Sequence, residues 1–62
     1  MDMKKFTWEA YNMEDECIGG GYVYAIDDCD ARKQIEQQIE EDIDEFTESG
    51  YFTHKIVSVS ED

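Results

Sequence analysis

The chain has 62 residues and carries 17 acidic against 5 basic side chains, for a formal net charge of -12. A chain of this length forms one domain and buries only about 60% of its unfolded surface. Its hydrophobic content of 40% is too high for a disordered acidic tail.

The charge disfavours direct binding to nucleic acid or anionic membranes, and favours cationic partners such as a basic protein surface or metal ions. No apolar run approaches the roughly 20 residues that span a bilayer. The N-terminal stretch MDMKKFTWEAYN has no apolar secretory core, so we expect a cytoplasmic protein.

The first half of the chain predicts two strands. KKFTWEAYN, residues 4–12, alternates apolar and polar side chains with a period of two, which is typical of a strand. MEDECIGGG, residues 13–21, is acidic and ends in three glycines, so it predicts a hairpin loop. GYVYAID, residues 21–27, predicts the second strand.

The second half predicts one helix and a third strand. Asp27 suits a helix N-cap, and Ser49-Gly50 suits a helix end, so we expect a helix over 28–47. Spacings of four, four, four and three give this helix an apolar stripe. The stripe consists of Ala31, Ile35, Ile39, Ile43 and Phe46. YFTHKIVSVS, residues 51–60, predicts the third strand.

These elements predict an α+β fold of order β-β-α-β, with a three-stranded antiparallel sheet. A hairpin followed by a crossover helix gives the strand order 2-1-3, and the helix covers one face of the sheet. The face beneath the helix is predicted to hold Phe6, Trp8, Ala10, Val23, Ala25, Val57 and Val59. The third strand remains ambiguous, because the adjacent Ile56 and Val57 must face opposite ways and Phe52 fits either side.

The opposite face has no second helix to cover it. It is predicted to hold Tyr11, Tyr22, Tyr24 and Ile26, and Ile56 if the third strand faces that way. An exposed apolar patch of this kind often marks an interface, so we expect a homodimer or a partner contact there. A solvated tyrosine-rich face is the alternative.

The residues that carry catalysis or bind metals are mostly absent. His54 is the only histidine and pairs with no recognisable nucleophile, so we expect no catalytic residues and no enzyme. Cys17, Cys29 and His54 could join one carboxylate around zinc, but their spacing matches no zinc motif. DDCD at 27–30 and EEDID at 40–44 lack the central glycine of a calcium loop. We therefore predict no metal site and no cofactor.

Acidic side chains crowd the predicted helix and the hairpin. The helix carries Glu36, Glu40, Glu41, Asp42, Asp44, Glu45 and Glu48, and the hairpin carries Glu14, Asp15 and Glu16. Four helical pairs lie at i,i+4, where like charges cost roughly 0.2–0.5 kcal/mol each, and the crowding at the helix C-terminus also opposes its dipole. On one continuous helix the seven carboxylates fall about every 3 Å of axis, against ~3.4 Å between phosphates on one DNA strand. These acids are predicted to bind a basic nucleic-acid-binding protein surface. A merely solubilising surface is the alternative.

By its size, its charge and its acidic segment QIEQQIEEDIDEFTES in a β-β-α-β frame, the chain resembles small acidic phage-encoded inhibitors, the anti-CRISPR and DNA-mimic proteins. The resemblance implies a stoichiometric inhibitor that blocks the nucleic-acid site of a host defence nuclease in the host cytoplasm, and many such proteins are dimers. Through FTWEAYN and GYVYAIDDCDAR the chain is also similar to small hairpin-helix-strand adaptor domains, which implies a non-enzymatic docking or dimerisation module.

Overall fold

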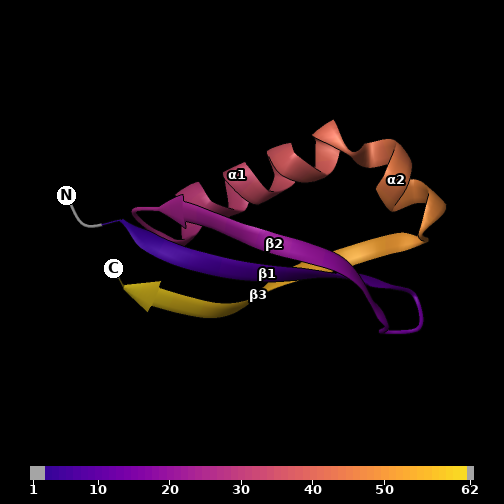
Figure 1. The fold of residues 1–62 in the computed structure, drawn as a ribbon, viewed down its shortest axis with the longest axis horizontal. Coiled ribbons are helices and arrows are strands. Elements are labelled where there is room, and N and C mark those ends of the chain that lie inside the picture. The colour runs from indigo at the N-terminus through magenta and orange to yellow at the C-terminus, as the bar shows by residue number, and fades with distance from the viewer. Residues whose placement is uncertain (1–2, 62) are drawn as a thin grey trace.

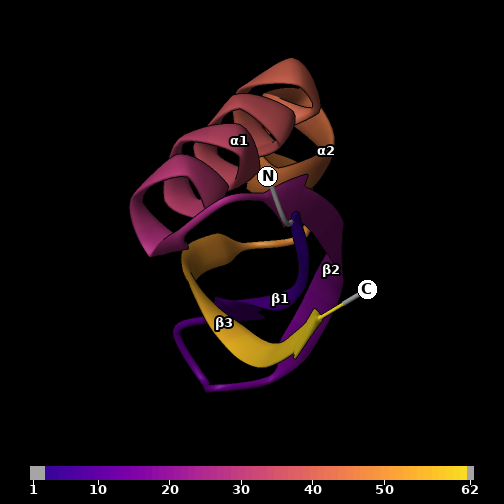
Figure 2. The same cartoon turned by 90° about the vertical axis from the view of Figure 1, so that its left-hand side faces the viewer.

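The computed structural model describes residues 3–61 and has five elements (Figure 1). These are β1 (Lys4–Asn12), β2 (Cys17–Ala25), α1 (Asp28–Glu41), α2 (Ile43–Glu48) and β3 (Tyr51–Glu61). The three strands form one antiparallel sheet in the order β2-β1-β3, which confirms the predicted α+β fold and its strand order. Both helices lie on one side of the twisted sheet (Figure 2), so the opposite face is left without a covering layer.

The buried core lies between α1 and the middle of the sheet. Its members are Phe6, Trp8, Ala10, Val23, Ala25, Ala31, Ile35 and Ile39. All five of the sheet residues in this set were predicted to face the helix. Asp27 caps α1 as predicted, since its Oδ1 accepts a hydrogen bond of 2.8 Å from the backbone N–H of Asp30. The Gln34 side chain donates a hydrogen bond to the backbone carbonyl of Tyr24 at 2.9 Å, which ties α1 to the end of β2.

The three glycines belong to β2, so the predicted loop over 13–21 is wrong. The loop is only Met13–Glu16, and Gly19 and Gly21 pair with Ala10 and Trp8 of β1. A Cβ on Gly21 would lie 3.4 Å from the Trp8 indole nitrogen, and one on Gly19 would lie 3.6 Å from the Phe46 ring. The glycines therefore leave room for two aromatic rings that lie against the strand.

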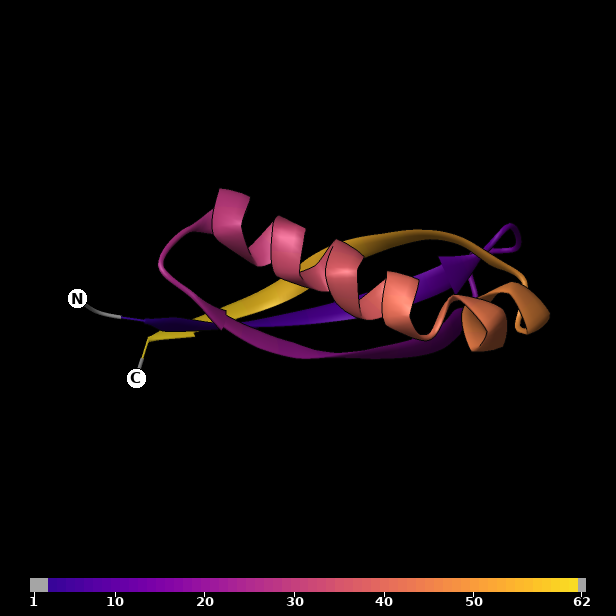
Figure 3. The same ribbon diagram turned by 90° about the horizontal axis from the view of Figure 1, so that it is seen from above.

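The predicted single helix is broken at Asp42. Asp42 has φ -113° and ψ 28°, and its N–H bonds back to Gln38 and Ile39 in a tightened last turn. α2 then turns toward the sheet (Figures 1 and 3). As a result Phe46 packs against the core, whereas Ile43 is 45% exposed and does not join it as predicted. Gly19, Gly20 and Gly21 of β2 offer no side chains to meet a straight helix, and Phe46 occupies part of that space.

Two β-bulges determine which side chains of β3 point toward the helices. The pairing steps from Thr7–Ser58 to Trp8–Ile56, so Val57 is an extra residue, and Ile56 packs half-buried on the core. Val57 is 43% exposed, which corrects its predicted place beneath the helix. A second shift between Thr53 and Tyr51 makes Phe52 the extra residue, and it is 63% exposed.

Val59 was also predicted to be covered, and is 50% exposed. It pairs with the buried Phe6, so it lies in the correct register. The packing between helix and sheet is concentrated on β2 rather than β3, and α1 runs obliquely across the sheet (Figure 3). Val59 therefore has the predicted register in the strand, and it is exposed because the helices do not cover it.

Candidate partner-binding surface

All ten acidic residues predicted to bind a partner have exposed side chains. Glu36, Glu40 and Glu41 lie on α1, Asp42 lies at the break, and Asp44, Glu45 and Glu48 lie on α2. The break means that these carboxylates do not form one straight row, so the predicted spacing of about 3 Å along a single axis is wrong. It also removes the fixed one-turn spacing from the two i,i+4 pairs that span Asp42.

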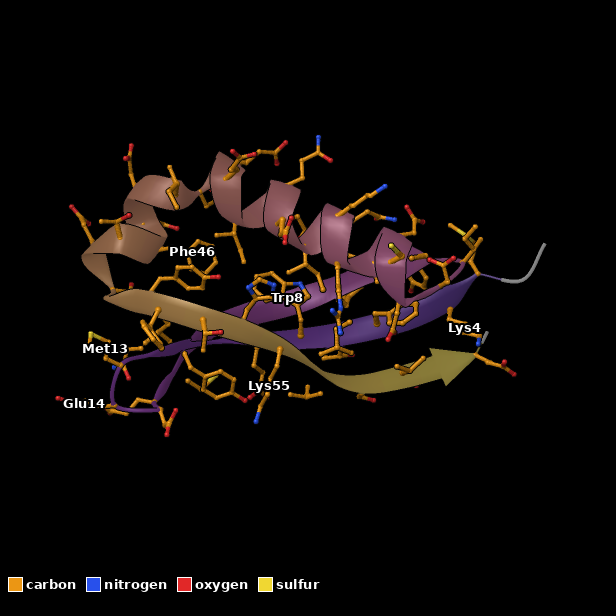
Figure 4. The ribbon with its side chains drawn as sticks, turned by 180° about the vertical axis from the view of Figure 1, so that it is seen from behind. Lys4, Trp8, Met13, Glu14, Phe46 and Lys55 are labelled. Carbon is orange, nitrogen blue, oxygen red and sulfur yellow. The ribbon has the colours of Figure 1, made fainter. Side chains whose placement is uncertain are left out.

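The structure brings α2 and the β1–β2 hairpin to the same end of the molecule. Asn12 pairs with Tyr51, and a Cβ on Gly50 would lie 3.9 Å from the Asn12 side chain. Figure 4 shows Glu14 at the hairpin tip below α2, with Lys4 at the far end of the sheet. We call this the acidic end. It consists of the hairpin residues Glu14, Asp15 and Glu16 together with Asp42, Asp44, Glu45 and Glu48.

Asn12 orders the hairpin tip, a role that was not predicted. Its side-chain oxygen accepts hydrogen bonds of 2.9 Å from the N–H groups of both Glu14 and Glu16. Its own N–H donates to the Glu16 carbonyl at 3.1 Å. Asp15 adopts a positive φ of 64°, which Asp tolerates better than most residues. An asparagine that ends a strand before a short polar stretch is a recognisable turn signal.

Among residues 3–61, no carboxylate of the acidic end forms an ion pair. Within residues 3–61 the one ion pair closer than 4 Å joins Lys4 and Glu61 at 3.8 Å, and both side chains are largely exposed. Lys5 lies 4.5 Å from the Tyr22 ring centre, and Lys55 lies 5.1 Å from that of Tyr11. Lys4 and Lys5 therefore lie away from the acidic end. Lys55 lines a pocket together with Asp15 of the hairpin tip but forms no ion pair with it.

On the sheet face opposite the helices, the predicted tyrosine cluster is divided into two parts. Tyr22 and Tyr24 are 54% and 42% exposed and meet edge to face, with ring centres 5.7 Å apart. Tyr11 pairs with Cys17 near the other end of the hairpin, four positions along β1 from the partner of Tyr22. Ile26 is exposed but lies beyond the end of β2.

Tyr11 is held by Glu9, which accepts a 2.6 Å hydrogen bond from its hydroxyl. This bond, followed by partial desolvation and the negative charge of Glu9, raises the pKa of Tyr11 to about 12. The folded pKa lies above the unfolded value near 10, so the contribution to stability is present below pH 10 and is lost as the pH rises toward 12.

We therefore expect an ultraviolet titration to show one tyrosine that ionises near pH 12, and Glu9→Gln to lower the pKa of that residue. Tyr22→Phe is the control, since its loss should leave the late transition unchanged. A titration in which Glu9→Gln leaves every tyrosine transition in place would contradict the assignment.

Within residues 3–61, the candidate residues for catalysis or metal binding are not assembled into a site. Cys17 and Cys29 are free, exposed thiols. His54 Nδ1 and the Tyr51 hydroxyl lie 2.7 Å apart in a hydrogen bond, and the two rings are stacked. Over residues 3–61, no three side chains of the His, Cys, Asp or Glu type are grouped as a metal ion requires. None of the described helices combines the length and apolar character that crossing a membrane requires.

Comparisons of the chain with protein-family models, with curated proteins and with solved structures find no match. The surfaces of the α+β domain are therefore the observations on which a function can be proposed.

Proposed function

We propose that the protein is a stoichiometric inhibitor that mimics nucleic acid and occupies the basic nucleic-acid-binding groove of a host defence nuclease complex, such as a CRISPR effector. The observation that carries the proposal is the acidic end, where seven exposed carboxylates gather and none has an ion-pair partner within 4 Å among residues 3–61. Such a surface raises the local attraction for a positively charged partner and speeds its association.

The dimensions of the molecule support this use. Its backbone extends 38 × 20 × 15 Å, so its long axis is close to one helical turn of DNA, about 34–36 Å. Carboxylates along α1, around α2 and on the hairpin present charge over a curved surface rather than along one line. Arginine and lysine side chains that normally hold phosphate oxygens can pair with carboxylate oxygens in the same way. The proposal needs no catalytic residue and no cofactor.

The test measures binding of the protein to a purified CRISPR effector complex in the presence of its DNA target. We expect mutually exclusive binding, because the protein and the DNA backbone would use the same cationic side chains. We also expect the affinity to fall steeply between about 50 and 200 mM salt, as it does for nucleic acid. Simultaneous binding of DNA and the protein, or an affinity insensitive to salt, would contradict mimicry for that effector.

A second candidate is an adaptor or dimerisation module. It is favoured by the exposed edge-to-face pair Tyr22 and Tyr24 on the uncovered sheet face. In that case the double change Tyr22→Ala with Tyr24→Ala would abolish function, and neutral replacements of the helical carboxylates would leave it intact.

A further inference from the structure

A groove of about 450 Å³ lies between α2 and the edge of the sheet. It is lined by Ile18, Gly19, Gly20, Asp42, Glu45, Phe46, Glu48 and Ser49. Two features of the fold create it. The break at Asp42 swings α2 toward the sheet, and the glycines of β2 bring no side chains to fill the space beneath it.

The groove combines an apolar floor with an acidic rim. Phe46 and Ile18 are half-buried and pack on the core, so part of each remains on the groove. Asp42, Glu45 and Glu48 provide three exposed carboxylates on the α2 side, and none has a cation within 4 Å among residues 3–61. A side chain that has a long apolar stem and a cationic head matches both parts.

The opposite wall of the groove is main chain. β2 is an edge strand, because the order β2-β1-β3 leaves one side of it unpaired. Gly19 and Gly20 have no side chains to screen that edge, so it can offer hydrogen-bond acceptors to an incoming group. The edge strand on the opposite side of the sheet, β3, differs, since two bulges and the exposed Phe52 and Val57 interrupt it.

We propose that this groove receives an arginine side chain of the partner protein. Arginine has a planar guanidinium with five donors that can pair with carboxylates and strand carbonyls together, and it stacks on aromatic rings such as Phe46. Lysine has a compact, strongly hydrated head that makes poorer use of a flat ring. The inference rests on the proposed function and deepens it, because it selects one anchoring residue within a broadly basic partner surface.

The test uses two capped peptides, one of alternating glycine and arginine and one of alternating glycine and lysine. Their binding to the whole protein is followed by amide chemical shifts in NMR spectra. We expect the arginine peptide to shift the amides of Gly19, Gly20 and Phe46 most strongly. The lysine peptide should bind several-fold more weakly.

Matched variants locate the site. Glu45→Gln with Glu48→Gln removes two carboxylates from the rim, and should weaken the arginine peptide by about tenfold. Asp28→Asn with Glu61→Gln removes the same charge from exposed positions outside both the groove lining and the acidic residues assigned to partner binding, and should change the affinity by less than about twofold at physiological salt. Circular dichroism of both variants verifies that the fold is retained.

Several outcomes would contradict the proposal that the groove binds arginine. These are equal weakening by the two double variants, shifts spread over all the acidic residues, equal affinity for the two peptides, or no binding of the arginine peptide. None of these results bears on mutually exclusive binding of the protein and DNA to the effector, so the proposed function is judged by that separate measurement.

Discussion

Lysine at four acidic helical positions is expected to abolish binding to the proposed nuclease partner. The positions are Glu40, Glu41, Asp44 and Glu45. Each replacement removes one negative charge and adds one positive charge, so the formal net charge rises from -12 to -4. Removing one partner of a desolvated charge pair costs about 2–5 kcal/mol, and reversal adds repulsion. The affinity should therefore fall by more than about a thousandfold in a direct binding measurement.

The same variant should fold at least as well as the parent. Lysine at position 40 lies one turn after Glu36, and lysine at position 44 lies one turn before Glu48, so two repulsive i,i+4 pairs become attractive. A thermal midpoint equal to or above that of the parent would separate lost binding from lost structure. Tyr22→Ala with Tyr24→Ala serves as the control, since it changes an exposed surface without changing the net charge. If the lysine variant binds normally while the tyrosine variant does not, the adaptor function is correct and mimicry is not.

The sequence was sufficient to predict the fold because its local patterns agree with one another. Alternation in residues 4–12, the cap at Asp27 and the spacing of Ala31, Ile35 and Ile39 each point to the element that the structure contains. The strand order followed from the short hairpin and the crossover. The ten acidic residues predicted to form a partner-binding surface are all exposed.

The predictions that proved wrong depend on contacts between residues that are far apart in sequence. Three glycines favour a loop on local propensity, whereas in the strand Gly19 and Gly21 face the rings of Phe46 and Trp8 and Gly20 faces the β1 backbone. The break at Asp42 involves neither glycine nor proline, so no local signal marks it. The bulge at Val57 inserts one residue into β3 and exchanges the places of neighbours, which alternation alone cannot reveal.

The groove was missed for the same reason. Its floor comes from Phe46 and Ile18, which are far apart in sequence, and its shape requires both the helix break and the glycine strand. Ten exposed carboxylates predict a positively charged partner. Where an arginine of the proposed partner would bind depends on packing that the sequence pattern does not reveal.

Gly20 is the position where a single methyl group should have the largest effect on folding. A Cβ at Gly20 would clash with the Trp8 carbonyl oxygen and lie 3.2 Å from the Glu9 Cα. Both are backbone atoms of β1, so they cannot move aside as a flexible side chain can, and the two strands must separate. Overpacking of this kind costs about 1–3 kcal/mol. A core in so small a domain rarely provides more than about 3–5 kcal/mol.

Gly20→Ala is therefore expected to lower the midpoint of thermal unfolding by about 5–20 °C. Gly19→Ala is the matched control one residue away. Its Cβ would make an ordinary 3.6 Å contact with the Phe46 ring, and the loss of glycine freedom in the unfolded chain offsets any small strain. Fluorescence of Trp8, the sole tryptophan and a buried residue, reports the transition directly. Equal midpoints for the two variants would mean that β1 and β2 approach each other less closely at Gly20 than the structure has them. In that case the glycines would serve only to seat the two aromatic rings.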